Sequence, residues 1–367
     1  MRTLMGALAL GLACATAACS RPDTPSATQS QPTPVPAWEA ENPIMPLPES
    51  PLGAEIQLAS LPNAPTPAQV RLGRWLFYDT RLSADGSIAC ATCHKPEHAF
   101  SEPTPHSTGI RGQQGGRKAP SFVNAAVTLY PHFFWDGRAA SLEEQALGPV
   151  ANPIEMGATH ESMIAAIEKA GAYAPYFKEA FGSDGITKER VAAAIAAYEK
   201  TRMSGNSPVD RWRLNKDESA VSDQVKQGYE LFFNKAGCNQ CHLGNSYTDS
   251  QFHNIGVGYD RKTKTFRDEG RSAISKDPAH RGAFKTPTLR DVAKHAPYMH
   301  DGSVATLRET VELYNRGGEP NPNLDPKIKK LNLTPGEVEA LVAFMEALNG
   351  EGYMDTAPKV FPGAAGE

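Results

Sequence analysis

The chain has 367 residues, of which 40% are hydrophobic, so it can bury a sizeable core and is not a wholly disordered protein. Its 37 lysine and arginine residues against 41 aspartate and glutamate residues give a formal net charge of -4. This mild acidity argues against nucleic acid as the main partner, because phosphate binding requires a basic surface.

The first segment, residues 1–19, has the features of a secretory signal peptide. An apolar run extends from Leu4 to Ala18 after a positively charged start; a membrane-spanning helix would need ~20 apolar residues. The small residues that precede Cys19 resemble a bacterial lipobox. We therefore expect export to the periplasm and a lipid anchor on Cys19. Ordinary cleavage stays open as an alternative, because Thr16 is unusual at the first lipobox position.

Residues 20–51 form a segment rich in Pro, Ser, Thr, Gln and Ala, with almost no apolar periodicity. A segment of this composition cannot bury enough apolar surface to order itself. It predicts a semi-extended linker, so the folded part is expected to begin near Leu52.

All four cysteines beyond the signal peptide lie in two Cys-x-x-Cys-His pentads, at 90–94 and 238–242. In such a pentad two thiols can form thioether bonds to the vinyl groups of one haem, while the adjacent His binds the iron. Disulfides or a redox pair do not require this His, and about 145 residues separate the pairs, far from the ~15–20 typical of zinc sites. The sequence predicts two covalently bound c-type haems. The thioether residues are Cys90, Cys93, Cys238 and Cys241, and the proximal iron ligands are His94 and His242.

Helix signals precede both pentads and recur after them. Thr66 and Gln69 form a capping box that opens the first predicted helix, and a second helix is expected over 224–233. An Asp-Gly pair followed by a capping box occurs at 136–144 and again at 301–309, an offset of 165 residues. The recurrence predicts two related modules.

Further helices are predicted over 188–202 and 335–348, and no alternating strand pattern exceeds a few residues. The predicted fold is therefore mainly α, with two cytochrome c-like haem domains that have long loops and arise by internal duplication. We expect the N-terminal haem domain over 52–212, the C-terminal haem domain over 213–355 and a tail over 356–367.

The two pentads, the Trp135-Asp136-Gly137-Arg138 turn and the segments 152–157 and 296–302 follow one another in an order that closely resembles the bacterial di-haem cytochrome c peroxidase / MauG family. The resemblance covers about residues 60–350. It implies a helical protein in which the first haem handles peroxide and the second stores or relays electrons.

The resemblance implies roles for three residues. Glu155 matches the distal glutamate, a general acid–base group for cleavage of the peroxide O–O bond, and Trp135 matches the tryptophan between the haems. Tyr314 matches the sixth ligand of the second haem, where ordinary peroxidases of the family carry Met and the MauG branch carries Tyr. From sequence alone, Glu155 reads as a helix-terminal or surface carboxylate, and both aromatic residues read as core. Met299 and His300 are competing ligands that we rank below Tyr314.

The chain departs from the family pattern at two positions. Ile110 stands where many members hold a distal His, and Ile cannot bind iron. The first haem is therefore expected to be five-coordinate and to meet peroxide without reductive activation, although His106 could substitute. Lys118 stands where the family usually places an Asn ligand of calcium, alongside carbonyls at positions matching His295 and Pro297. An ammonium cannot coordinate a cation, so calcium is doubtful, and Lys118 could take its place.

We predict an enzyme that reduces H2O2 at the N-terminal haem, with electrons passed through the C-terminal haem from a small exported cytochrome or copper protein. Tyr314 and Ile110 favour an alternative, MauG-like oxidation of a residue of a partner protein. A reading from another class is a non-catalytic di-haem electron carrier, which would need two six-coordinate irons and no distal acid or base.

Overall fold

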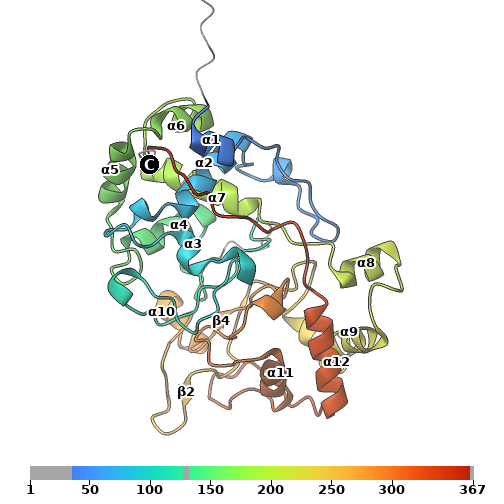
Figure 1. Cartoon of the computed structure of the whole chain (residues 1–367). Helices are drawn as coiled ribbons and strands as arrows, with labels where there is room; N and C mark the ends of the chain where they lie inside the picture. Colours follow the sequence, from blue (N-terminus) through green and yellow to red (C-terminus); the bar gives the residue numbers. More distant parts are fainter. Residues whose placement is uncertain (1–34, 127–131, 364–367) are drawn as a thin grey trace, which may run out of the picture. The chain divides into compact units, whose positions relative to one another are not determined.

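A computed structural model describes residues 35–126 and 132–363 (Figure 1). The predicted signal peptide and Cys19 lie outside the described residues. In the described part of the chain, no helix is long and apolar enough to cross a membrane.

Helices dominate the regular structure of these residues, as predicted. They are α1 Ala37–Glu41, α2 Pro67–Tyr78, α3 Cys90–Cys93, α4 Leu142–Ala151, α5 His160–Ala170, α6 Ala174–Phe181, α7 Lys188–Lys200, α8 Pro208–Asn215, α9 Asp223–Phe233, α10 Ser272–Ser275, α11 Leu307–Asn315 and α12 Pro335–Glu346. The strands have two residues each and pair antiparallel: β1 Phe252–His253 with β4 Phe284–Lys285, and β2 Tyr259–Asp260 with β3 Thr265–Phe266.

The predicted capping signals begin the expected helices. Thr66 caps α2, Thr306 caps α11 and Thr334 caps α12, each in a reciprocal capping box. Ser141 caps α4, but the Glu144 carboxylate accepts from the backbone N–H of Ala140 instead of that of Ser141. Side chains that satisfy the first free N–H groups therefore set these helix starts, as their sequence signatures indicate.

Folded structure occurs before the predicted start near Leu52. Residues 37–41 form α1, and the indole of Trp38 donates a hydrogen bond to the Tyr176 hydroxyl at 2.6 Å. The amide of Asn42 donates to the carbonyl of Arg71 at 3.0 Å, and Asn42 is buried. The composition of residues 20–51 as a whole predicts a linker, although Trp38 and Asn42 within it attach to the folded part.

Buried apolar side chains form two large clusters that follow the two halves of the chain. The first draws on residues 72–198 together with Tyr353, and the second on residues 209–348. Their division lies close to the predicted domain boundary at 212/213, although α8 packs with the second cluster. The extent of the two domains stays a prediction.

One tightly packed helix pair supports each cluster: α2 with α7, and α9 with α12 (Figure 1). Both pairs cross at a glycine. A Cβ atom added to Gly73 would overlap the carbonyl oxygen of Ala194, and one added to Gly228 would overlap that of Ala340. In both pairs the helix backbones can approach this closely only because the crossing residue has no side chain.

We expect Gly228→Ala to lower the free energy of unfolding by about 1–3 kcal/mol, the usual cost of overpacking a core. Gly336→Ala is the matched control on α12, because no atom lies within 4 Å of its added Cβ. The control should leave stability unchanged or slightly raise it, since alanine favours a helix. Chemical denaturation of both variants measures the difference, and equal midpoints would contradict the packing argument.

The Asp-Gly turns that suggested duplication have the same local structure. In the first turn the N–H of Phe133 donates to the carbonyl of Ala139 at 2.9 Å, and in the second the N–H of Tyr298 donates to the carbonyl of Val304 at 2.6 Å. Both the donor and the acceptor of the second bond lie 165 residues after those of the first. The turn glycines have φ values of +69° and +62°, which favour glycine. The likeness supports internal duplication, which stays a prediction.

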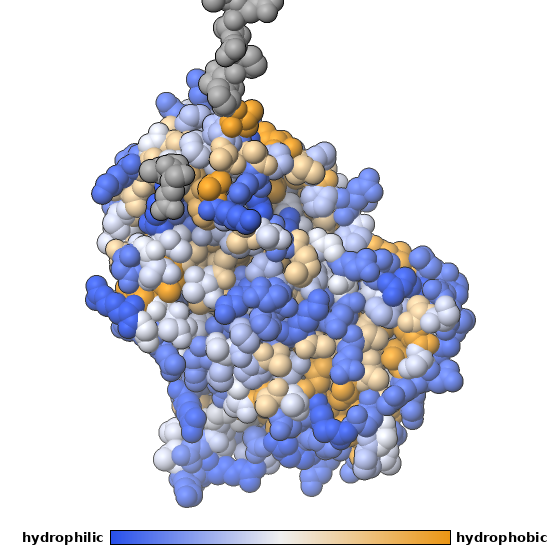
Figure 2. Space-filling view, in the orientation of Figure 1, coloured by the Kyte–Doolittle hydropathy of each residue, from blue (hydrophilic) through white to orange (hydrophobic). Residues whose placement is uncertain are grey.

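On the face shown in Figure 2, hydrophilic residues cover most of the surface of the described part and hydrophobic residues form small separate groups. The most exposed large apolar side chains are scattered along the chain: Val35, Ile44, Met45, Leu214, Leu243, Ile274 and Met354. Single exposed apolar residues of this kind are ordinary and mark no particular site.

Candidate active site

Each Cys-x-x-Cys-His pentad lines its own cavity. The first cavity has a volume of about 610 Å³ and is lined by Cys90, Cys93 and His94, among others. The second has a volume of about 200 Å³ and is lined by the matching residues Cys238, Cys241 and His242. The four cysteines are free, not joined in disulfides, so their thiols are available to the two haems.

Both histidines are held in the orientation that an iron ligand needs. Nδ1 of His94 lies 2.9 Å from the carbonyl oxygen of Phe100, and Nδ1 of His242 lies 2.9 Å from that of Tyr247. A carbonyl can only accept, so Nδ1 carries the proton and Nε2 keeps its lone pair. Burial also lowers the pKa of both imidazoles and keeps them neutral. These residues fit covalently attached c-type haem.

Glu155 lines the first cavity together with His94 and lies in the turn that follows α4. The amide of Asn152 donates to its Oε1 at 2.7 Å. Burial raises the pKa of Glu155 above its usual value, while Arg138 and the Asn152 bond act in the opposite direction. A half-buried carboxyl with one oxygen held and a raised pKa can both accept and return a proton.

The loop that carries Ile110 supports the Glu155 turn. Ile110 N–H donates to the carbonyl of Glu155 at 2.8 Å, and its buried side chain packs against Gly157. Among the described residues that line the first cavity, His94 is the one histidine, and His106 is not part of the lining. A five-coordinate first haem stays our prediction.

Trp135 lines both cavities. Its indole N–H donates to the carbonyl of Lys118 at 2.8 Å. The rest of its turn is held from the C-terminal half of the chain, because Arg271 donates to the carbonyls of Asp136 and Gly137 at 3.0 and 2.9 Å. The structure therefore gives this tryptophan a fixed position beside both haem sites.

The second cavity is lined by Tyr314 from α11 and also by Met299 and His300, the competing ligands. Burial raises the pKa of Tyr314. The imidazole of His300 is stacked on the Phe284 ring with 3.6 Å between ring centroids. All three candidates are thus within the second site, and the choice of Tyr314 stays a prediction.

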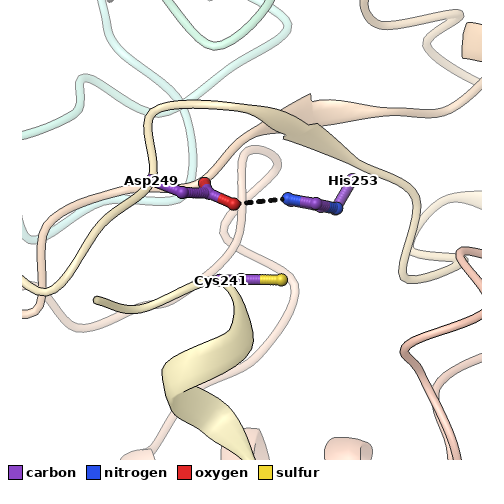
Figure 3. Close-up of side chains that lie close together, drawn as sticks. All are labelled: Cys241, Asp249 and His253. Atoms are coloured by element: carbon purple, nitrogen blue, oxygen red, sulfur yellow. Dashed lines mark hydrogen bonds and ion pairs between the residues drawn. The ribbon is translucent and has the colours of Figure 1, made fainter. Parts of the chain in front are cut away.

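A hydrogen-bonded cluster that no sequence motif predicted lies beside the second pentad (Figure 3). His253 lies 2.9 Å from a carboxylate oxygen of Asp249 and 2.6 Å from one of Asp325. Burial alone would lower the pKa of His253, but hydrogen bonds with Asp249 and Asp325 raise it. Cys241, Asp249 and His253 lie close enough to hold a metal ion. Once Cys241 is joined to haem by a thioether bond, it has no thiolate to offer such an ion.

Buried Glu199 and half-buried Lys285 lie in no sequence motif, so their environments were not predicted. Glu199 on α7 lines the first cavity, and burial raises its pKa to about 8. Lys285 lines both cavities, and burial lowers its pKa to about 8. Only the packing of distant segments reveals these environments.

The chain is similar to known di-haem proteins over most of its length. Residues 67–219 match the family model described as di-haem cytochrome c peroxidase. The chain is 40% identical over 292 residues to the methylamine utilization protein MauG of Methylorubrum extorquens, covering 79% of this chain and 81% of that protein. It is 38% identical over 280 residues to the cytochrome c551 peroxidase of Nitrosomonas europaea, covering 76% and 79%.

Among solved structures, a MauG-like protein associated with microbial copper homeostasis superposes with a TM-score of 0.73 at 30% identity. The match covers 83% of this chain and 94% of that one.

Proposed function

The chain belongs to the di-haem cytochrome c peroxidase family, whose members are peroxidase-type oxidoreductases with two covalently bound c-type haems. We propose that it reduces H2O2 at the His94 site. Electrons reach this site through the His242 site from an exported redox protein. The observation that carries the proposal is the presence of Glu155 and His94 in one cavity.

When bound, the haem supplies the iron that takes the peroxide and the oxidising equivalents that follow. Glu155 then takes a proton from one peroxide oxygen and returns it to the oxygen that leaves as water. Asn152 orients the Glu155 carboxylate through its bond to Oε1, which leaves Oε2 for the proton. The hydrogen bond from Nδ1 of His94 to the Phe100 carbonyl orients the imidazole, so that Nε2 can bind the iron.

Trp135 is proposed as the relay between the two sites, because it lines both cavities and its indole is oxidisable. We expect Trp135→Phe to slow electron transfer between the haems by about tenfold or more, a change of ~1.4 kcal/mol in the barrier. Stopped-flow absorption after peroxide mixing measures this rate.

Trp212→Phe is the control for the relay, because Trp212 lines neither cavity and its indole donates to exposed Glu218 at 3.3 Å. The control should keep the wild-type rate. Equal rates in Trp135→Phe and Trp212→Phe would exclude Trp135 as the relay.

MauG-like oxidation of a residue of a partner protein is the second candidate. Two observations favour it: Tyr314 lines the second cavity, and among the described residues no histidine of the loop around Ile110 lines the first. A phenolate is a hard anionic ligand that stabilises oxidised iron, so a Tyr-ligated site holds oxidising equivalents better than it accepts electrons from a high-potential donor.

A peroxide assay separates these uses. The holoprotein is mixed with H2O2 and, in parallel, with reduced small cytochromes, copper proteins and exported proteins encoded beside it. Donor oxidation with peroxide loss supports the peroxidase, whereas a covalent change in a partner protein supports the MauG-like enzyme. No peroxide loss with any of them would contradict both and favour a non-catalytic electron carrier.

We also propose that the chain acts in the periplasm, held to a membrane by lipid on Cys19. The support is the signal pattern of residues 1–19. Mass spectrometry of the mature N-terminus tests this: a diacylglyceryl cysteine is expected, and an unmodified N-terminus would contradict the anchor.

A further inference from the structure

Lys118 is a cation buried inside the protein. It is 4% exposed, and its ammonium donates to the backbone carbonyl of Glu102. Burial lowers its pKa to about 8, while the Glu102 carboxylate opposes the shift. The Glu102 carboxylate is itself buried and accepts from the N–H of Ala119 at 2.6 Å. The bond to the Glu102 carbonyl therefore holds the Lys118 ammonium at a defined place.

The backbone of Lys118 joins the two haem sites. Its carbonyl accepts from the indole of Trp135 at 2.8 Å, and its N–H donates to the carbonyl of His300 at 2.9 Å. Lys118 lines the first cavity, His300 lines the second, and Trp135 lines both. A shift of Lys118 would therefore move the proposed relay and the wall of the second site together.

The surroundings of Lys118 do not fit a calcium ion. His295, whose carbonyl stands at one of the expected calcium-ligand positions, is buried. Nε2 of His295 is buried and has no hydrogen-bond partner among the described residues. Calcium prefers oxygen ligands, and here an ammonium, which can only donate, stands at the expected ligand position. Adding two further positive charges there would cost Coulomb energy.

We propose that the Lys118 ammonium replaces the calcium ion that family resemblance implies between the haem sites, so that this chain holds the Trp135 turn without metal. The inference rests on the family resemblance and on the contacts of Lys118. It does not require the proposed peroxidase reaction, and its test measures metal content and stability.

The test compares the wild-type holoprotein with Lys118→Asn and Lys118→Met. The wild type should contain no stoichiometric calcium, and its unfolding temperature should not change with chelator or with added CaCl2. Both variants should unfold at temperatures lower by about 5 °C or more. Added CaCl2 should restore Lys118→Asn, which regains an oxygen ligand, but not Lys118→Met, which has none.

Three results would overturn the inference: about one calcium per wild-type chain, a chelator-sensitive wild type, or no calcium rescue of Lys118→Asn. Should the variants fail to fold, the metal content and chelator response of the wild type decide alone. The peroxide assay is a separate experiment, so its failure would contradict the proposed function and leave this result standing.

Discussion

Replacing Glu155 by Gln should lower kcat/KM for hydrogen peroxide by about 10²–10⁴-fold, the usual contribution of a general acid–base group. The amide keeps the shape of the side chain and can still contact Asn152, but it cannot take up or return a proton. Haem content, absorption spectrum and unfolding temperature should stay at wild-type values. Steady-state peroxide kinetics with a chemical electron donor measure the loss.

Glu161→Gln is the matched control, because Glu161 is an exposed carboxylate in the first turn of α5. It should keep wild-type activity. If Glu155→Gln retains activity within about twofold of this control, a difference of ~0.4 kcal/mol, Glu155 does not transfer the proton.

The pH dependence should follow the same residue. Burial raises the pKa of Glu155, and the carboxylate form is needed to take the first proton. Activity should therefore fall as pH is lowered through this raised pKa, at a higher pH than for an ordinary glutamate. The acid limb should be absent from the residual activity of Glu155→Gln, and a limb that persists unchanged would assign it to another group.

The second large effect is expected at Tyr314. Tyr314→Met exchanges a hard anionic oxygen ligand for a soft thioether, which stabilises the reduced iron. We expect the reduction potential of the second haem to rise by an amount on the order of 0.1–0.3 V, within the ≈ 0.8 V range that axial ligands span. The first haem should change much less. Spectroelectrochemical titration of both haems measures the shift.

Tyr314→Phe separates the competing ligands of the second site. If Tyr314 binds the iron, Phe removes the ligand and changes the spectrum of the second haem. If Met299 or His300 is the ligand, Tyr314→Phe leaves spectrum and potential almost unchanged, while Met299→Leu or His300→Phe alters them. That outcome would remove the main support for the MauG-like alternative.

Local sequence signals predicted the parts of this protein that depend on neighbouring residues. The pentads that end at His94 and His242 follow from the short spacing that haem attachment demands, and the capping boxes at Thr66 and Thr306 follow from hydrogen bonds three residues apart. The cavity shared by Glu155 and His94 agrees with the family pattern. These features required no knowledge of long-range packing.

Features made by distant segments were not predictable in this way. Trp38 belongs to a segment that reads as linker, yet it bonds Tyr176, which lies 138 residues away. The charge of His253 depends on Asp325, 72 residues away. The direction of the Ile110 side chain is set by its packing on Gly157, and only the fold places those two residues together.

We expect peroxide to react at an open site on the His94 haem. The absorption and electron paramagnetic resonance spectra of the fully oxidised protein, before and after one equivalent of H2O2, test this. We expect one high-spin and one low-spin haem at rest, with the high-spin signal lost on addition of peroxide and no prior reduction needed. Two low-spin haems and no spectral change would contradict it.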